Sequence, residues 1–127
     1  MRSLAILFLT TLLLIPRLTM AQENRLDARS FKARLAEKDV QLVDVRTPAE
    51  YAKGHIPGSV NNDWLEDGFL ERAKTLDKAK PVLLYCAAGG RSEEAMAALK
   101  TAGFTDVVDL IVGFNGWKQN NLPVSVK

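Results

Sequence analysis

The sequence predicts an α/β fold with a small central, mostly parallel sheet and helices on both faces. Two observations indicate it. Short apolar runs alternate with amphipathic helical patterns along the chain. In addition, the apolar run Pro81–Tyr85 leads into a loop of small residues, and a helical pattern begins directly afterwards at Glu93. A length of 127 residues suits one domain.

The first residues have the layout of a secretory signal peptide. Arg2 gives a positive start, Leu4–Ile15 is an apolar run shorter than the ~20 residues that span a bilayer, and small residues precede a cleavage site after Ala21. We therefore expect residues 1–21 to be cleaved, residues 22–127 to form the domain, and the protein to be periplasmic or secreted without a stable membrane anchor.

Composition excludes several classes of function. Of 17 basic residues, Arg2 and Arg17 lie in the predicted signal peptide, which leaves 15 basic against 15 acidic residues and no basic tract, so we expect no nucleic-acid partner. One cysteine and one histidine allow neither an internal disulfide exchange nor a zinc site. The sequence calls for no metal and no cofactor.

In the first half of the domain, capping residues and apolar periodicity mark the elements. Asp27 is placed to cap a helix over 28–37, and Thr47 to cap a short helix that Gly54 ends. A helix is also expected over 64–76, although Gly68 interrupts it at a cost of about 1 kcal/mol relative to alanine. The strands expected here are Val40–Val45 and Ser59–Asn61.

In the second half, the strand Pro81–Tyr85 is followed by a helix over 92–102, with Ser92 as its cap. Val107–Leu110 is the last expected strand. A short helix begins near Gly113, and Asn121 is placed to end it in a left-handed conformation.

The loop after Tyr85 carries the only cysteine, Cys86. Ligands of parallel sheets bind beyond the carboxyl ends of strands, where this cysteine lies. Gly89 and Gly90 give the backbone freedom to approach a ligand, and a helix start favours negative charge through its free N–H groups. A lone cysteine is often a small buried hydrophobic residue. The glycines, arginine and helix start behind this one favour a reactive thiolate instead.

Four motifs in order resemble the rhodanese domain, from about Leu26 to Val124. The motifs are Leu42–Tyr51, Gly54–Asn61, the loop Cys86–Ser92, and Gly103-Phe104 with Gly113, Trp117 and Leu122-Pro123-Val124. The likeness is to single-domain, exported thiosulfate sulfurtransferases, and it implies a rhodanese-like fold.

The resemblance implies that Cys86 is the catalytic nucleophile. It would take the sulfane sulfur of thiosulfate or a similar donor, become a persulfide, and pass the sulfur to cyanide, a small thiol or a protein thiol. The residues that the resemblance assigns to substrate binding are Ala87, Ala88, Gly89, Gly90, Arg91 and Ser92. Arg91 is expected to assist the binding of a dianionic donor. Ala87 and Ala88 stand where many rhodaneses carry basic or aromatic side chains, which would alter donor affinity or selectivity.

Two other functions remain open. Related phosphatases and arsenate reductases place five residues between the cysteine and the arginine, whereas this chain has four. A non-enzymatic rhodanese-like module that binds a partner through the loop is the other alternative.

Four further residues are candidates for supporting roles. Asp44, Arg46 and Glu50 are expected to form an ion-pair and capping network at a strand end, with a place for Arg46 at the site mouth as the alternative. His55 is expected to stabilise a turn by bonding backbone groups, with a general base for Cys86 as the alternative.

Overall fold

The computed structural model describes residues 24–127, which form a five-stranded sheet in the order β1-β5-β4-β2-β3 with every pair of strands parallel. The α/β class and the parallel pairing are confirmed. The predicted signal peptide, residues 1–21, lies outside the described residues. Within residues 24–127 no helix is long and apolar enough to cross a membrane. The strands are β1 (Arg25–Leu26), β2 (Gln41–Asp44), β3 (Val60–Asn61), β4 (Val82–Tyr85) and β5 (Val107–Leu110).

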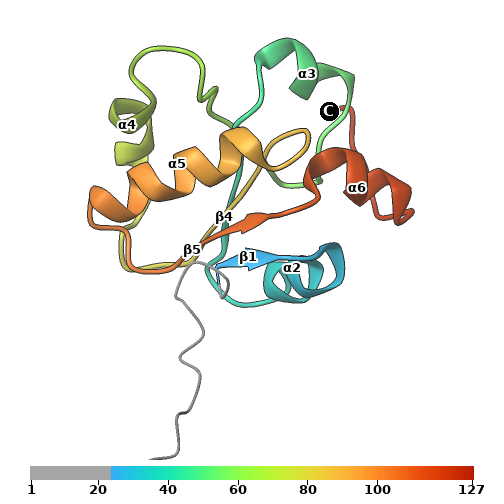
Figure 1. The fold of residues 1–127 in the computed structure, drawn as a ribbon, viewed down its shortest axis with the longest axis horizontal. Helices are drawn as coiled ribbons and strands as arrows, with labels where there is room; N and C mark the ends of the chain where they lie inside the picture. The colour runs from blue at the N-terminus through green and yellow to red at the C-terminus, as the bar shows by residue number, and fades with distance from the viewer. Residues whose placement is uncertain (1–23) are drawn as a thin grey trace, which may run out of the picture.

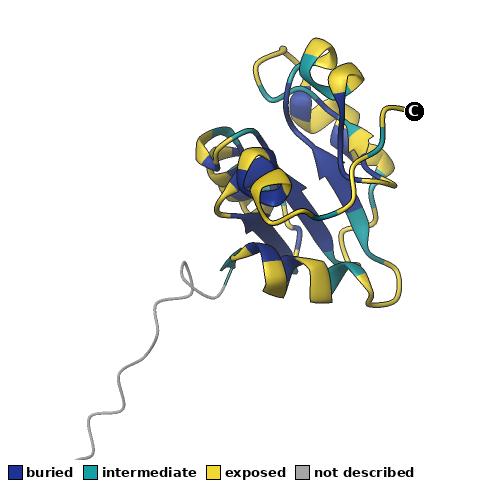
Figure 2. Cartoon of the chain, turned by 90° about the vertical axis from the view of Figure 1, so that its right-hand side faces the viewer, coloured by how far each residue is buried: buried dark blue, intermediate teal, exposed yellow. Residues whose placement is uncertain are grey.

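The helices cover both faces of the sheet, as Figure 1 and Figure 2 show. One face packs against α4, the following 3-10 turn η1 and α5, and the other against α2 and α6. The central strand β4 divides its side chains by the two-residue period of a strand: Val82 and Leu84 face one layer, and Leu83 and Tyr85 the other. The helical segments are α2 (Ala28–Leu35), α3 (Pro48–Lys53), α4 (Phe69–Arg72), η1 (Ala73–Thr75), α5 (Gly90–Thr101) and α6 (Gly113–Gln119).

Local sequence signals account for several helix ends. Asp27 accepts a hydrogen bond from the Ser30 amide at 2.8 Å and caps α2. Thr47 caps α3 as expected, and Glu50 completes a reciprocal capping box with it. Asn121 takes the left-handed conformation expected of it, with φ of 54°.

The helix predicted over 64–76 is wrong in its first part. Residues 64–68 form turns, and only α4 and η1 are helical. Gly68 adopts a left-handed φ of 87°, which stops a helix from running through it. The Arg72 guanidinium holds the turn by donating to the carbonyl oxygens of Asp63, Glu66 and Asp67.

Strand β1 was not expected from the sequence, because two residues carry too little pattern. Its pairing with β5 comes from contacts distant in sequence: the Asp109 amide donates to the Asn24 carbonyl at 2.8 Å, and the Ile111 amide donates to the Leu26 carbonyl at 2.9 Å. β1 therefore closes one edge of the sheet beside the strand that follows the Cys86 helix.

Two substitutions test the corrected course of residues 64–76. We expect Phe69→Ala to lower the free energy of unfolding by about 3 kcal/mol, because Phe69 is buried in the core against the Trp64 ring. Leu65→Ala should change it by less than ~0.5 kcal/mol, because Leu65 is exposed in a turn. Denaturant unfolding of both variants measures this. A large loss for Leu65→Ala would contradict the observed turn.

Candidate active site

Cys86 follows the last residue of β4 and is buried, with 1% of its surface exposed. The chain turns immediately after it, and Gly89, with a left-handed φ of 98°, starts α5. This turn brings the Gly89 amide to 3.1 Å from Cys86 Sγ. Of the loop amides expected to face the sulfur, that of Gly89 therefore donates a hydrogen bond to it.

The opposite side of the loop is fixed by α6. The amide of Phe114 donates to the Cys86 carbonyl at 2.8 Å, and the amide of Asn115 donates to the Ala87 carbonyl at 3.0 Å. Gly113 permits this approach, since a Cβ there would overlap the Ala87 carbonyl. With these carbonyls held toward α6, the following amides of the loop are free to face the sulfur.

The environment favours the thiolate form of Cys86. Burial raises the pKa of the thiol, but hydrogen bonding by Ser92 and by the backbone amides of Ala88 and Gly89 outweighs it, so the pKa lies below its ordinary value.

Ser92 is not the helix cap that the sequence suggested. It is the third residue of α5, which begins at Gly90, and it is fully buried. Its hydroxyl lies 3.5 Å from Cys86 Sγ and donates to Asp109 Oδ2 at 2.9 Å. Gly89 caps the helix instead, because its left-handed conformation turns the loop.

Arg91 is held in a bidentate ion pair with Glu50 of α3. The distances are 2.8 Å from Nη1 to Oε1 and 3.0 Å from Nη2 to Oε2. This hydrogen-bonded pair lowers the pKa of Glu50 to about 2, against the opposing effect of burial. The sequence placed Glu50 in a cap network, which is confirmed through Thr47, but did not predict its pairing with Arg91.

Asp44 and Arg46 form a buried pair at the end of β2, as expected. Arg46 Nη2 lies 2.7 Å from Asp44 Oδ2 and donates to the Gly54 carbonyl at 2.6 Å, while its guanidinium stacks over the Phe114 ring at 4.2 Å. Because every one of these contacts is internal, Arg46 braces the segment that leads to His55.

The ring of His55 bonds backbone groups, as expected, but His55 itself lies in an antiparallel bridge with Ser125, and the turn follows at Pro57 and Gly58. Nδ1 lies 2.9 Å from the Tyr51 carbonyl oxygen and Nε2 lies 3.0 Å from that of Lys127, and the imidazole stacks on the Tyr51 ring. Both ring nitrogens are occupied by backbone, so His55 has no nitrogen left to act as a base for Cys86.

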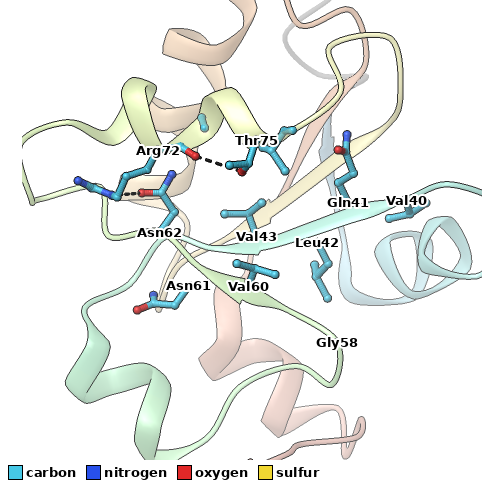
Figure 3. Close-up of a pocket in the computed structure, with 12 residues that line it drawn as sticks. Val40, Gln41, Leu42, Val43, Gly58, Val60, Asn61, Asn62, Arg72 and Thr75 are labelled. Carbon is cyan, nitrogen blue, oxygen red and sulfur yellow. Dashed lines mark hydrogen bonds between the residues drawn. The ribbon is translucent and has the colours of Figure 1, made fainter.

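A separate pocket of about 320 Å³ lies between β2, β3 and the α4–η1 segment. Figure 3 shows Leu42, Val43 and Val60 on its walls and the Arg72–Asn62 hydrogen bond at one end. None of the loop residues 86–92 lines it. Among the described residues no group of histidine, cysteine and acidic side chains could hold a metal ion.

Residues 27–120 match the protein family described as the Rhodanese-like domain. The chain belongs to this family.

Relatives of this rhodanese-like domain include named sulfurtransferases. A protein called Sulfurtransferase from Allochromatium vinosum is 38% identical over 103 residues, which cover 80% of this chain and 94% of the relative. Thiosulfate sulfurtransferase GlpE of Pseudomonas fluorescens is 38% identical over 84 residues, covering 66% and 75% of the two chains. Chloroplastic thiosulfate sulfurtransferase 16 of Arabidopsis thaliana is 35% identical over 93 residues, covering 65% and 78%.

Solved structures share the fold. The rhodanese-like domain of the Anabaena Alr3790 protein superposes with a TM-score of 0.73 at 30% identity, covering 80% of this chain and 78% of that one. A rhodanese-related protein from Thermoplasma volcanium gives 0.73 at 28% identity, covering 82% and 99%. The rhodanese-like fold expected from the motifs is thus confirmed.

Sequence reasoning missed Asp109 and Arg25. Asp109 is fully buried in β5 and bonded to Ser92, and Arg25 of β1 pairs with it, Nε to Oδ1, at 3.1 Å. The available signal was a carboxylate interrupting the otherwise apolar strand Val107–Leu110. That signal indicates that Asp109 is unusual, but it does not predict that its partners are Ser92 and Arg25.

Gly89→Ala tests the loop geometry. Alanine there would adopt an unfavourable positive φ, and its Cβ would overlap the Ile111 carbonyl. We expect a loss of about 2 to 4 kcal/mol in the free energy of unfolding. We also expect a higher pKa for the Cys86 thiol, because the amide at 3.1 Å shifts away. Chemical unfolding and thiol titration measure the two effects.

Gly58→Ala is the matched control for this loop variant. Gly58 also has a positive φ, of 84°, but nothing lies within 4 Å of the added Cβ. It should cost about 1 kcal/mol and leave the thiol unchanged. Equal losses in the two variants would contradict a tightly packed Cys86 loop.

The Arg91–Glu50 pair predicts an acid-sensitive contribution to stability. The pKa of Glu50 falls from 4.5 to about 2 in the folded protein, so its stabilisation is complete above pH 4.5 and is lost as the pH falls through about 2. Glu50→Gln should therefore be less stable than wild type at pH 7, with the difference closing over that interval. Unfolding measured across pH tests this.

Glu71→Gln serves as the control for the loss of a carboxylate. Glu71 pairs with Lys74 at the exposed surface, so its removal should change stability by less than ~0.5 kcal/mol. A Glu50→Gln difference that persists unchanged to pH 2 would argue against the ion pair as its source.

Proposed function

We propose that this rhodanese-like domain is a sulfurtransferase in which Cys86 carries the transferred sulfur. The observation that supports it most directly is the Gly89 amide, which lies 3.1 Å from the buried Cys86 sulfur in a loop closed by α6. Backbone donors arranged in advance around a sulfur stabilise both a thiolate and the negative charge of a bound sulfur. The named sulfurtransferases among its relatives support the same activity.

In the proposed reaction the Cys86 thiolate attacks the sulfane sulfur of thiosulfate or a similar donor. The bond from that sulfur to the sulfonate breaks, sulfite leaves with the bonding electron pair, and a Cys86 persulfide anion remains. Cyanide or a thiolate then attacks the outer sulfur, taking it and releasing the Cys86 thiolate. Each step conserves charge, and one thiol suffices, in agreement with the single cysteine of the chain.

The charges near the loop favour amide recognition of the donor. The positive charge of Arg91 is balanced by Glu50, and Ala87 and Ala88 add no cation. We therefore assign donor binding mainly to the backbone amides of residues 87–92, with the unpaired Arg91 hydrogens as a secondary contact. The acceptors proposed are cyanide, a small thiol or a protein thiol.

Two other functions make different predictions for this loop. A phosphatase or arsenate reductase needs a loop that encloses a tetrahedral oxyanion, and four residues between Cys86 and Arg91 form a small one. A non-enzymatic binding module would leave Cys86 unmodified.

The proposed export of residues 22–127 would place the protein in the periplasm or outside the cell.

Incubation with thiosulfate should add the mass of one sulfur atom to the protein, and cyanide should remove it with release of thiocyanate. Intact-mass spectrometry measures this, and Cys86→Ala should show neither step, because it lacks the accepting sulfur. The intact mass of protein taken from its host before any reductant would also show whether residues 1–21 are absent.

The same experiment separates the alternatives. Thiocyanate formation that survives in Cys86→Ala would refute the proposal. Hydrolysis of an aryl phosphate without any persulfide would favour a phosphatase. A Cys86 that stays unmodified with thiosulfate and with small persulfides would favour a binding module.

A further inference from the structure

Asp109 is a fully buried carboxylate that the proposed sulfur transfer does not use. Among residues 24–127 its one charged partner is Arg25, which is paired with it across β1 and β5. Burying an ionised carboxylate is unfavourable unless its oxygens are well bonded. Here Oδ1 and Oδ2 receive the Arg25 guanidinium at 3.1 and 3.3 Å, and Oδ2 also receives the Ser92 hydroxyl at 2.9 Å.

The Ser92 hydroxyl stands between Asp109 and the nucleophile. Its oxygen lies 2.9 Å from Asp109 Oδ2, 3.3 Å from the Gly89 carbonyl and 3.5 Å from Cys86 Sγ. A serine hydroxyl has a single hydrogen to donate. Three acceptors therefore compete for one hydrogen, and the nucleophile is one of them.

The carboxylate is the strongest of the three acceptors. Hydrogen bonds to charged groups are shorter and about twice as strong as neutral ones, and the Asp109 contact is the shortest. The hydrogen therefore points at Asp109, and a lone pair of the Ser92 oxygen faces Cys86. This arrangement suits a thiol, which donates its own hydrogen to Ser92, and opposes a thiolate, which needs a donor.

We propose that Asp109 is a positioning residue for Cys86, acting through the hydroxyl hydrogen of Ser92 to restrain the ionisation that the loop amides promote. The loop amides and Asp109 therefore act in opposite directions on the ionisation of the Cys86 thiol. The Gly89 amide stabilises the anion, whereas Asp109 withdraws the one side-chain hydrogen that would also stabilise it.

The other charges near the sulfur are balanced in pairs, so they do not mask this effect. The groups that act on Cys86 or on its charged neighbours are Arg25, paired with Asp109 and Glu93, and Arg91, paired with Glu50 and near Asp63. Removing the charge of Asp109 would act on Cys86 directly as well as through Ser92. An experiment must separate the two routes.

A consequence for the persulfide follows, and this part rests on the proposed sulfur transfer. In a Cys86 persulfide the negative charge lies on the outer sulfur, and Sγ is uncharged, so Ser92 keeps its bond to Asp109. Discharge to cyanide makes Sγ a thiolate again. Asp109 therefore favours the loaded form and slows its discharge.

The test is a titration of the Cys86 thiolate by its ultraviolet absorbance, which one cysteine per chain makes specific. Asp109→Asn can keep its oxygen on Arg25 and donate its amide to Ser92, which frees the hydroxyl hydrogen for the sulfur. We expect the apparent pKa of the thiol to fall by about one unit. Asp106→Asn, which removes a carboxylate paired with Arg34, should leave it unchanged.

Ser92→Ala separates the two routes. In that background Asp109→Asn should shift the thiol pKa by less than half as much, because the hydroxyl that links the two groups is absent. A shift of full size without Ser92 would assign the effect to direct charge and overturn the proposal, as would a wild-type pKa in Asp109→Asn. These outcomes are read from the thiol alone and do not depend on sulfur transfer.

Two further measurements complete the test. Neutron diffraction of the wild-type protein should place the Ser92 hydrogen on the line to Asp109 Oδ2, and a hydrogen directed at Gly89 or Cys86 would overturn the proposal even where Asp109→Asn does not fold. In the loaded protein, Asp109→Asn should discharge to cyanide several-fold faster than wild type, and equal or slower discharge would reject the persulfide consequence alone.

Discussion

The orientation of the peptide groups after Cys86 is the constraint on which the site depends. α6 takes the carbonyls of Cys86 and Ala87, and Gly113 lets it approach closely enough to do so. The left-handed Gly89 then turns its amide onto the sulfur. The parallel sheet serves this arrangement, because it places the end of β4 between β2 and β5 and thus next to the segments that hold the loop.

Paired charges link the elements around this loop. One pair lies within the end of β2, and its arginine also donates to the Gly54 carbonyl in the turn after α3. A second pair ties α3 to α5, and a third ties β1 to β5. The pairs are Arg46 with Asp44, Arg91 with Glu50, and Arg25 with Asp109. Because each guanidinium is matched by a carboxylate, these groups stiffen the site without giving it a large positive field.

Much of the fold could be predicted because its signals are local. The apolar run of β4, the Thr47–Glu50 capping box and the left-handed Asn121 follow from residues close in sequence. The predictions were wrong or incomplete where contacts with residues distant in sequence determine the local structure. Gly68 and the carbonyls bound by Arg72 replace a predicted helix with turns, and β1 exists only through β5.

The candidate site divides along the same line. The loop and its nucleophile were recognisable from order and spacing, since glycine, small residues and a helix start are adjacent in the chain. The partners of its side chains were not. Arg91 was expected to face a donor and is bonded to Glu50, 41 residues away, and Ser92 was expected to cap a helix and is bonded to Asp109, 17 residues away. A side chain's type predicts what it can bond, but the topology selects its partner.

The difference between the local loop backbone and side chains with distant partners affects how the thiolate is stabilised. Side-chain cations near Cys86 are balanced by carboxylates, so the amides of the loop supply the donors that offset the burial of the thiolate. Backbone dipoles keep their direction as long as the loop keeps its shape, and they carry no net charge that would have to be removed from water. Such a cradle can favour an anion on Cys86 Sγ or on a sulfur bonded to it with little rearrangement. The side chains Ser92 and Asp109 are then free to adjust how strongly that anion is favoured, without carrying it themselves.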